Sequence, residues 1–380
     1  MDLLIALGVI VIASVAIMYA CNSFDDAASY LGRNMAPGVR GATINAIGSS
    51  MPELMTAMFL LFLFHDRDGF AAGVATTAGS AIFNAVIIPA LCIFAVRYKG
   101  IIVKGSGNAA AVVREKVTQI QATKSSLLRD GSFLLIAEAA LIWFLGNSVM
   151  TWWMGGALLM IYGVYFLFLA AGFGATSDDD DGEEDTEDED DESPSKLKAL
   201  FTFDFNNLIY SGGNYTLGSA WVVLSLATVV IGIACWQLAE AVMLSADALG
   251  VPAYFTALIF AAAATSVPDT ILSVKDAMRG EYDDAISNAV GSNTFDITVG
   301  LGLPLLLYAL IFGNVEVYSV DQTQALRIVL FAVTVVVLGI LLLRSHATVA
   351  TAYLLLIIYA GWMGFVFYDM AGVIGAQGAG

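Results

Sequence analysis

Residues 48–53 read Gly48-Ser49-Ser50-Met51-Pro52-Glu53, and a near copy, Ala264-Thr265-Ser266-Val267-Pro268-Asp269, recurs more than 200 residues later. Each hexapeptide is followed by a second shared element: Gly79-Ser80-Ala81-Ile82-Phe83-Asn84 after the first copy, and Gly291-Ser292-Asn293-Thr294-Phe295-Asp296 after the second. All four lie in or beside long apolar stretches, where hydroxyl, amide and carboxyl groups are expensive to bury, so they mark a candidate functional site. A duplicated site of this kind is typical of secondary transporters, whose repeats meet around the substrate.

The composition places the chain in a membrane. Of its 380 residues, 58% are hydrophobic and 13% are charged, and the mean hydropathy is +0.79, which is too apolar for a soluble domain of this length. Apolar runs long enough to cross a hydrocarbon core of about 30 Å recur along it. The N-terminus has no basic region of the kind that begins a signal peptide, so we expect the first segment to remain as a span. Cys21, Cys92 and Cys235 form no metal-binding or disulfide spacing and are interpreted as packing residues.

The apolar runs predict an all-α polytopic membrane protein with ten transmembrane helices. They lie at about 2–21, 36–64, 69–97, 131–148, 151–173, 216–246, 252–278, 282–311, 326–344 and 348–370. An acidic tract divides them five and five, and an odd number per half makes the second repeat enter the membrane from the opposite side. We therefore predict two inverted five-helix repeats: 1–173, with its motif at about 40–95, and 206–380, with its motif at about 255–305.

The acidic tract lies in the segment between the repeats, 174–205. Residues 178–192 contain 13 of the 34 acidic residues, so most of the net charge of −18 comes from them. Such a dense run of like charges predicts a disordered, solvated loop. A regulatory calcium sensor is the alternative, although the tract contains only Gly182 as a turn residue.

The basic residues predict the orientation. Fourteen of the 16 Lys and Arg residues lie on one predicted side, and only Arg67 and Arg327 lie on the other. By the positive-inside rule, the acidic loop is cytoplasmic, both termini are outside, and the protein is a multi-pass protein of the cell membrane. The basic segment 98–130 carries apolar residues at intervals and is expected to lie along the cytoplasmic surface.

The spacing of the polar residues predicts their chemistry. Residues three and four apart share one face of a helix, which groups Ser49 and Ser50 with Glu53, Thr265 and Ser266 with Asp269, Ser80 with Asn84, and Ser292 with Asp296. Pro52 and Pro268 each remove a backbone N–H, which frees the carbonyls of Gly48 and Ala264 and predicts broken helices. The donors are all oxygen atoms, which suits hard cations such as Ca²⁺, Na⁺ or K⁺ rather than zinc or copper.

Several residues leave two interpretations open. Each proline motif alone would also suit a kinked packing helix, but two matched copies favour a site. Phe83 and Phe295 are expected to pack rather than bind. Glu138, inside the fourth span, marks either a proton path or a contact between helices. Asp25, Asp26 and Glu240 are either rim acids or charges at an ion entrance.

The two motifs resemble the α-repeats of the calcium/cation antiporter superfamily, and in particular those of the potassium-dependent sodium/calcium exchangers. The similarity covers roughly residues 40–95 and 255–305; Ala264 stands where that pattern usually has glycine. The resemblance implies ions held by the second, third, seventh and eighth of ten helices, with Glu53 and Asp269 as the central calcium ligands. It also implies that the carbonyls of Ala46 and Ala262 help to bind calcium. The remaining candidate ligands for Ca²⁺, Na⁺ or K⁺ are Ser49, Ser50, Ser80, Asn84, Thr265, Ser266, Ser292, Asn293 and Asp296.

These observations predict an antiporter that exchanges Na⁺ for Ca²⁺ by alternating access, because both ions need the same carboxylates. Three carboxylates exceed the charge of one Ca²⁺, so either K⁺ travels with calcium or Asp296 carries a proton. A Ca²⁺/H⁺ antiporter is the alternative, and a cation channel is a weaker one, since channels build their acidic rings by subunit symmetry. No His-Glu-x-x-His motif or nucleophile–base pair indicates an enzyme. We expect no cofactor and no nucleic-acid partner; the partners are the bilayer and inorganic cations, and the sequence leaves the oligomeric state open.

Overall fold

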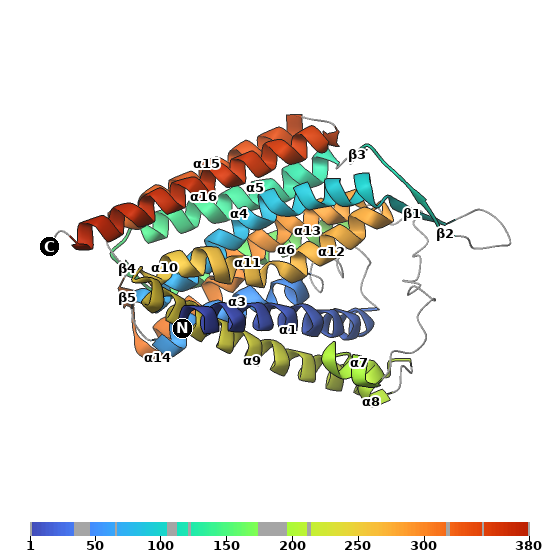
Figure 1. Cartoon of the computed structure of the whole chain (residues 1–380), viewed down its shortest axis with the longest axis horizontal. Coiled ribbons are helices and arrows are strands. Elements are labelled where there is room, and N and C mark those ends of the chain that lie inside the picture. The colour runs from blue at the N-terminus through green and yellow to red at the C-terminus, as the bar shows by residue number, and fades with distance from the viewer. Residues whose placement is uncertain are drawn as a thin grey trace.

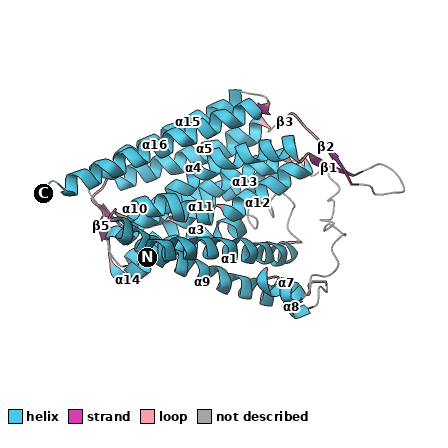
Figure 2. Ribbon diagram, in the orientation of Figure 1, coloured by secondary structure: helices cyan, strands magenta, loops and turns pink. Residues whose placement is uncertain are grey.

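The computed structural model describes residues 2–33, 46–64, 67–104, 112–120, 123–173, 196–210, 214–316, 320–343 and 346–378. Within these ranges the chain is almost entirely helical (Figure 2). The helices of the first half are α1 (Asp2–Leu31), α3 (Ala46–Phe64), α4 (Arg67–Tyr98), α5 (Lys124–Leu145) and α6 (Trp152–Phe173). Those of the second half are α7 (Lys196–Phe201), α8 (Phe205–Tyr210), α9 (Leu217–Leu249), α10 (Ala253–Thr256), α11 (Ala262–Thr265), α12 (Val267–Arg279), α13 (Tyr282–Phe295), α14 (Gly302–Phe312), α15 (Val320–Leu343) and α16 (Val349–Gly378). Two π-helical turns, η2 (Ala257–Ala261) and η3 (Asp296–Gly300), interrupt the second half.

The structure is that of an all-α polytopic membrane protein. Among the described residues, seven helices are long and apolar enough to cross a membrane, and there are eight if the bent pair Ala253–Thr265 and Val267–Arg279 is one span. Each of the ten predicted spans has a helical counterpart, but α5 and the described part of α15 fall short of the same length and composition criteria. Ten membrane crossings in two inverted repeats therefore stay a prediction.

The two proline motifs fold differently. The second copy is broken as predicted: α11 ends at Thr265, α12 begins at Val267, and the helical segments on either side of the break meet at 40°. The first copy is not broken within the described residues, because α3 continues through Pro52 from Ala46 to Phe64. The prediction of a broken helix was therefore wrong for the described part of the first motif, and residues 34–45 lie outside the described residues.

The helices run side by side in an elongated bundle (Figure 1). Helices α1 and α9 pack against each other along one side, α5, α15 and α16 lie along the other, and α3, α4, α11, α12 and α13 lie between them. Small residues bring the central helices close together; Ala75 and Ala81 of α4 and Ala289 of α13 are fully buried. Helices α1, α6 and α16 are apolar, and only 28% of the residues in their apolar windows are buried, as expected of surfaces that face lipid.

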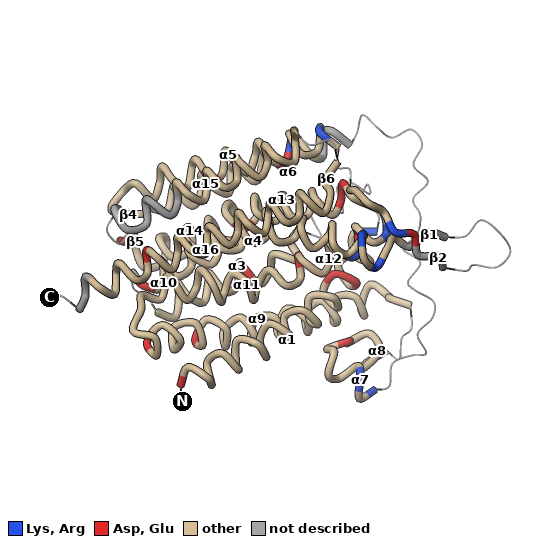
Figure 3. The backbone as a smooth tube through the Cα atoms, turned by 45° about the horizontal axis from the view of Figure 1, so that its top comes forward, with Lys and Arg blue, Asp and Glu red and all other residues tan. Residues whose placement is uncertain are grey.

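Short strands connect the helices at the ends of the bundle. In the basic segment 98–130, β1 (Ile101–Lys104) and β2 (Val112–Glu115) form an antiparallel hairpin. Strand β3 (Gln119–Ile120) pairs with β6 (Ala347–Thr348), and β4 (Val149–Met150) pairs with β5 (Val315–Glu316). Lysines and arginines gather at the end of the bundle that carries β1, β2 and α7 (Figure 3), which agrees with the predicted cytoplasmic side.

The segment predicted as a disordered loop, 174–205, contains regular structure at its end. Residues 196–201 form α7, and Ser23 of α1 donates a hydrogen bond to the carbonyl of Phe203 at 2.8 Å, which ties this end to the bundle. The prediction of disorder was therefore wrong for the end of the segment. The acidic tract itself, 178–192, lies outside the described residues.

Candidate cation-binding site

Three buried carboxylates from the two halves of the chain meet at the middle of the bundle. Glu53 comes from α3, Asp269 from α12, and Asp296 begins η3 at the end of α13. All three are fully buried, and an oxygen atom from each lies within 4.8 Å of the others. We call these residues the carboxylate triad. The sequence predicted each of them, but only the folded chain brings all three together.

Ser80 of α4 links the two halves. Its hydroxyl oxygen lies 3.3 Å from Glu53 Oε1, 3.2 Å from Asp296 Oδ2 and 2.9 Å from Ser266 Oγ. Asn84, one turn further along α4, donates to Ser80 Oγ at 3.4 Å. Since one hydroxyl has a single proton, it can donate to only one of these oxygens at a time.

Asp269 is held from both halves as well. Asn84 Nδ2 donates to Asp269 Oδ2 at 2.9 Å, and Ser292 Oγ donates to Asp269 Oδ1 at 3.0 Å. Ser49 interacts with the same carboxylate. Hydrogen bonds to a charged carboxylate are stronger than those between neutral groups, so these donors fix the orientation of Asp269.

The remaining predicted side chains surround the triad. Thr265 lies beside Glu53, and Ser50 lies beside Asp296. Asn293 instead donates to the carbonyl of Ala81 at 2.8 Å and so ties α13 to α4. Phe295 packs edge-on against Tyr162 and Phe83 against Tyr359, which confirms that both phenylalanines are packing residues.

The two predicted carbonyl ligands are in different situations. Ala262 O accepts hydrogen bonds from Ser266 N at 3.1 Å and from Thr265 Oγ1 at 3.3 Å, so it is already engaged. Ala46 is the first residue of α3. Its role as a ligand stays a prediction.

The motif glycines have different surroundings. A Cβ atom on Gly79 would lie 2.3 Å from Leu258 O of η2 and 2.6 Å from Ala262 Cβ, so only glycine lets α4 approach this backbone. A Cβ atom on Gly291 would meet only Tyr165 Oη, at 3.4 Å, which is an ordinary contact distance. Glycine is therefore required by close packing in the first motif but not in the second.

Oxygen atoms without partners show that the site suits a cation. Glu53 Oε2, Asp296 Oδ1 and Asn84 Oδ1 are buried, and none has a hydrogen-bond partner among the described residues. Two ionised carboxylates 4.8 Å apart repel each other by about 3.5 kcal/mol at an effective dielectric constant of about 20. Hard cations bound by oxygen would relieve that repulsion and use the lone pairs that are left over.

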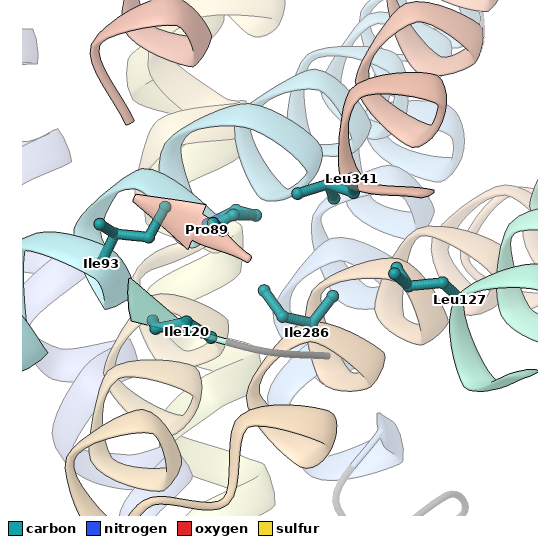
Figure 4. A pocket seen from close by; sticks show the side chains of 7 residues that line it. Pro89, Ile93, Ile120, Leu127, Ile286 and Leu341 are labelled. Atoms are coloured by element: carbon teal, nitrogen blue, oxygen red, sulfur yellow. The ribbon is translucent and has the colours of Figure 1, made fainter. Parts of the chain in front are cut away.

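A small cavity elsewhere does not have this chemistry. It lies among α4, β3, α5, α13, α15 and β6, and its lining is wholly apolar (Figure 4): Pro89, Ile93, Ile120, Leu127, Ile286, Leu341 and Ala347. It offers no oxygen ligand from a side chain. The triad is therefore the candidate cation site among the described residues.

Three polar groups were missed by the motif search, of which Ser273 and Asp276 are buried and Asn288 is half-buried. Ser273 and Asp276 lie four and seven residues after Asp269 on the same helix, and Asn288 lies four residues before Ser292. Helical spacing from the motif acids could have found them. Of the open cases, Glu138 accepts a hydrogen bond from Thr334 at 2.7 Å and joins α5 to α15, which supports a contact between helices. The three cysteines are buried and free, as expected of packing residues.

Comparison with protein families matches most of the chain. The family model described as sodium/calcium exchanger protein matches residues 5–171 and 219–368. These ranges contain every residue of the candidate site and leave out the acidic tract.

Two curated relatives share part of this match. The chain is 40% identical over 114 residues to the sodium/potassium/calcium exchanger Nckx30C of Drosophila melanogaster, covering 30% of this chain and 13% of that protein. It is 33% identical over 147 residues to sodium/potassium/calcium exchanger 4 of Mus musculus, covering 38% of this chain and 24% of that protein. The matched regions therefore span less than a quarter of either relative.

Solved structures share the fold. The H⁺/Ca²⁺ exchanger CAX aligns with a TM-score of 0.68 at 13% identity, over 97% of this chain and 88% of that one. The sodium-calcium exchanger NCX_Mj aligns with a TM-score of 0.55 at 17% identity, over 95% of this chain and 99% of that one. At this identity the likeness concerns the fold alone.

Proposed function

The chain belongs to the sodium/calcium exchanger protein family, and on that premise we propose that it is a secondary antiporter that exchanges Na⁺ for Ca²⁺ across the cell membrane. Members of this family are transporters rather than enzymes. The observation that carries the proposal is the carboxylate triad, which joins acids from both halves within 4.8 Å.

The proposed ligands follow from the contacts around the triad. Glu53 and Asp269 are the calcium carboxylates, and Asp296 with Asn84 adds oxygen atoms that lack partners. The hydroxyls and Asn293, together with the backbone carbonyls, complete the sodium and calcium positions: Ser49, Ser50, Ser80, Thr265, Ser266, Ser292, Ala46 and Ala262. Calcium takes six to eight oxygen ligands, which a set of this size can supply.

Coupling follows from sharing one set of carboxylates. Sodium ions that enter down their gradient occupy oxygen atoms that calcium also needs, so the two loads exclude each other. Without a cation, the mutual repulsion of the triad and the burial of its charges oppose closure of the site. Either cation load offsets most of this negative charge and permits the conformational change, so the carrier changes conformation when it is loaded and not when it is empty.

The proposed architecture is ten transmembrane helices in two inverted repeats, 1–173 and 206–380, with both termini outside and the acidic loop in the cytoplasm. Ser80 supports this architecture, because its hydroxyl contacts acids of both halves. A thiol introduced at Ser193 should escape an impermeant reagent applied to intact cells, whereas one added after Gly380 should react. The reverse labelling would overturn the orientation.

The counter-ion is the open choice within this proposal. The matched relatives are named as sodium/potassium/calcium exchangers, which favours Na⁺ with K⁺ as a second cargo. A Ca²⁺/H⁺ antiporter is the alternative, since carboxylates this close together can also bind protons.

Calcium flux in proteoliposomes tests the function. Vesicles that contain the purified protein are loaded with Na⁺, with choline, or with choline at low internal pH, and calcium uptake is followed with a fluorescent indicator. Uptake driven by the Na⁺ gradient supports the proposal, and uptake driven only by the proton gradient supports the alternative. Uptake that is independent of any counter-ion would indicate a channel.

A further inference from the structure

A row of polar side chains extends from the carboxylate triad toward one end of the bundle. Asp269, Ser273 and Asp276 lie on the same face of α12, at positions separated by four and three residues. Ser273 is fully buried and Asp276 is only 8% exposed. This half of α12 leads to Arg279, at the end of the bundle where the lysines and arginines gather (Figure 3).

Asn288 of α13 completes the row. Its Nδ2 donates to Ser273 Oγ at 3.0 Å and lies 3.5 Å from Asp269 O. The carboxylate of Asp276, in contrast, has no hydrogen bond or ion pair with any described residue. The charges that act on it are those of Glu281, Asp284, Arg279 and Lys275, together with Asp25 of α1. No described donor therefore competes with a cation for this carboxylate. We call Ser273, Asp276 and Asn288 the polar ladder.

The first half of the chain lacks the hydroxyl and the carboxylate of this row at the matching positions, although Thr76 corresponds to Asn288. When Glu53 is aligned with Asp269, Ser273 corresponds to Ala57 and Asp276 corresponds to Leu60. Ala57 and Leu60 are both buried. Packing therefore accepts small and apolar residues at these places, and the fold does not require a hydroxyl and a carboxylate there. The polar ladder is an asymmetry between the halves that needs another explanation.

Helix α1 supplies one more carboxylate beside this row. Asp25 Oδ1 is buried and has no hydrogen-bond partner among the described residues. A Cβ atom on Gly48 would lie only 1.8 Å from this oxygen atom, so only glycine leaves room for it. The charges of Asp269 and Asp276 both act on Asp25. Gly48 thus lets the carboxylate of α1 reach α3.

We propose that the polar ladder is the cytoplasmic entrance of the cation path, with Asp276 as the carboxylate that first captures the ion and Asp25 as a second charge along the way. This inference rests on the proposed exchange activity. A captured cation passes Ser273 and Asn288, whose oxygen atoms replace part of its hydration shell, and reaches Asp269. A negative charge at the start of the path raises the local cation concentration, so the ladder acts on the affinity seen from the cytoplasm.

Sided vesicles test this entrance. Sodium-driven calcium uptake is measured in inside-out and in right-side-out membrane vesicles for the wild type, Asp276→Asn, Asp276→Glu and Glu115→Gln. In Asp276→Asn the calcium concentration for half-maximal uptake should rise about tenfold at the cytoplasmic face, the lower end of the gain expected from a charged cleft. It should change less than about twofold at the outer face.

The other variants and faces make the result decisive. Glu115→Gln removes an exposed charge of β2, outside the ladder, and it should behave like the wild type, whereas Asp276→Glu should restore the cytoplasmic affinity. Normal uptake from the outer face shows that a variant is folded. A shift at both faces, at neither face or only at the outer face would overturn the entrance. Absence of sodium-driven uptake by the wild type would instead overturn the exchange activity on which it rests.

Discussion

Replacing Asp296 with asparagine removes one charge from the carboxylate triad and keeps its shape. Each pair of carboxylates 4.8 Å apart contributes about 3.5 kcal/mol of repulsion, or about 10 kcal/mol for the three pairs. The asparagine variant keeps one pair, so about two thirds of this repulsion disappears. It also gives the second motif the residue that the first motif already has at the matching position, Asn84.

The charge balance predicts the ion requirement. In the wild type, Ca²⁺ leaves one negative charge of the triad uncompensated, and a charge at the centre of a membrane costs at least about 2.5 kcal/mol. If K⁺ supplies the missing charge, replacing K⁺ with choline should reduce wild-type calcium flux at least tenfold, since a factor of ten requires about 1.4 kcal/mol. In Asp296→Asn the same replacement should change the flux less than about twofold, because Ca²⁺ now balances the two remaining carboxylates.

The assay is sodium-driven calcium flux in proteoliposomes, with K⁺ or choline on both sides. Asp247→Asn, which removes an exposed acid near the end of α9, is the control for loss of a charge elsewhere and should keep the wild-type response. Wild-type flux that is unchanged in choline would refute potassium transport and favour a protonated Asp296. An Asp296→Asn variant that still needs K⁺ would refute the charge argument itself.

Three further predictions concern the site and the loop. Glu53→Gln or Asp269→Asn should reduce calcium exchange to background in protein that is folded and in the membrane, and wild-type exchange by Glu53→Gln would exclude its role as a ligand. Gly79→Ala should destabilise the protein by about 1–3 kcal/mol through overpacking against Leu258 O, whereas Gly291→Ala should leave its melting temperature within a few degrees; equal melting temperatures would contradict the steric argument. Deletion of 178–192 should leave exchange largely intact, since charges in a solvated loop are screened beyond about 8 Å; complete loss of flux would favour a calcium sensor.

The chemistry of the site could be predicted from residues that are close in sequence. The i, i+3 and i, i+4 spacing placed Ser49 and Ser50 with Glu53, and Ser80 with Asn84, on common faces, because helix geometry fixes those relations locally. The duplicated motif and the apolar runs likewise indicated a membrane transporter with oxygen ligands. These features follow from local geometry and from the energy of placing polar groups in lipid, so the amino-acid sequence alone is enough to predict them.

Contacts between distant segments required the folded chain. Spacing along one helix does not say which faces meet, so it could not show that Ser80 touches acids of both halves or that Asp25 reaches Gly48. It also treated the two proline motifs alike, although α3 continues through Pro52 while the second copy breaks at Ser266, after the π-helical turn η2 and the short helix α11. Close packing against neighbouring helices decides such differences, because a local preference of a few kcal/mol yields to the contacts that only the assembled bundle makes.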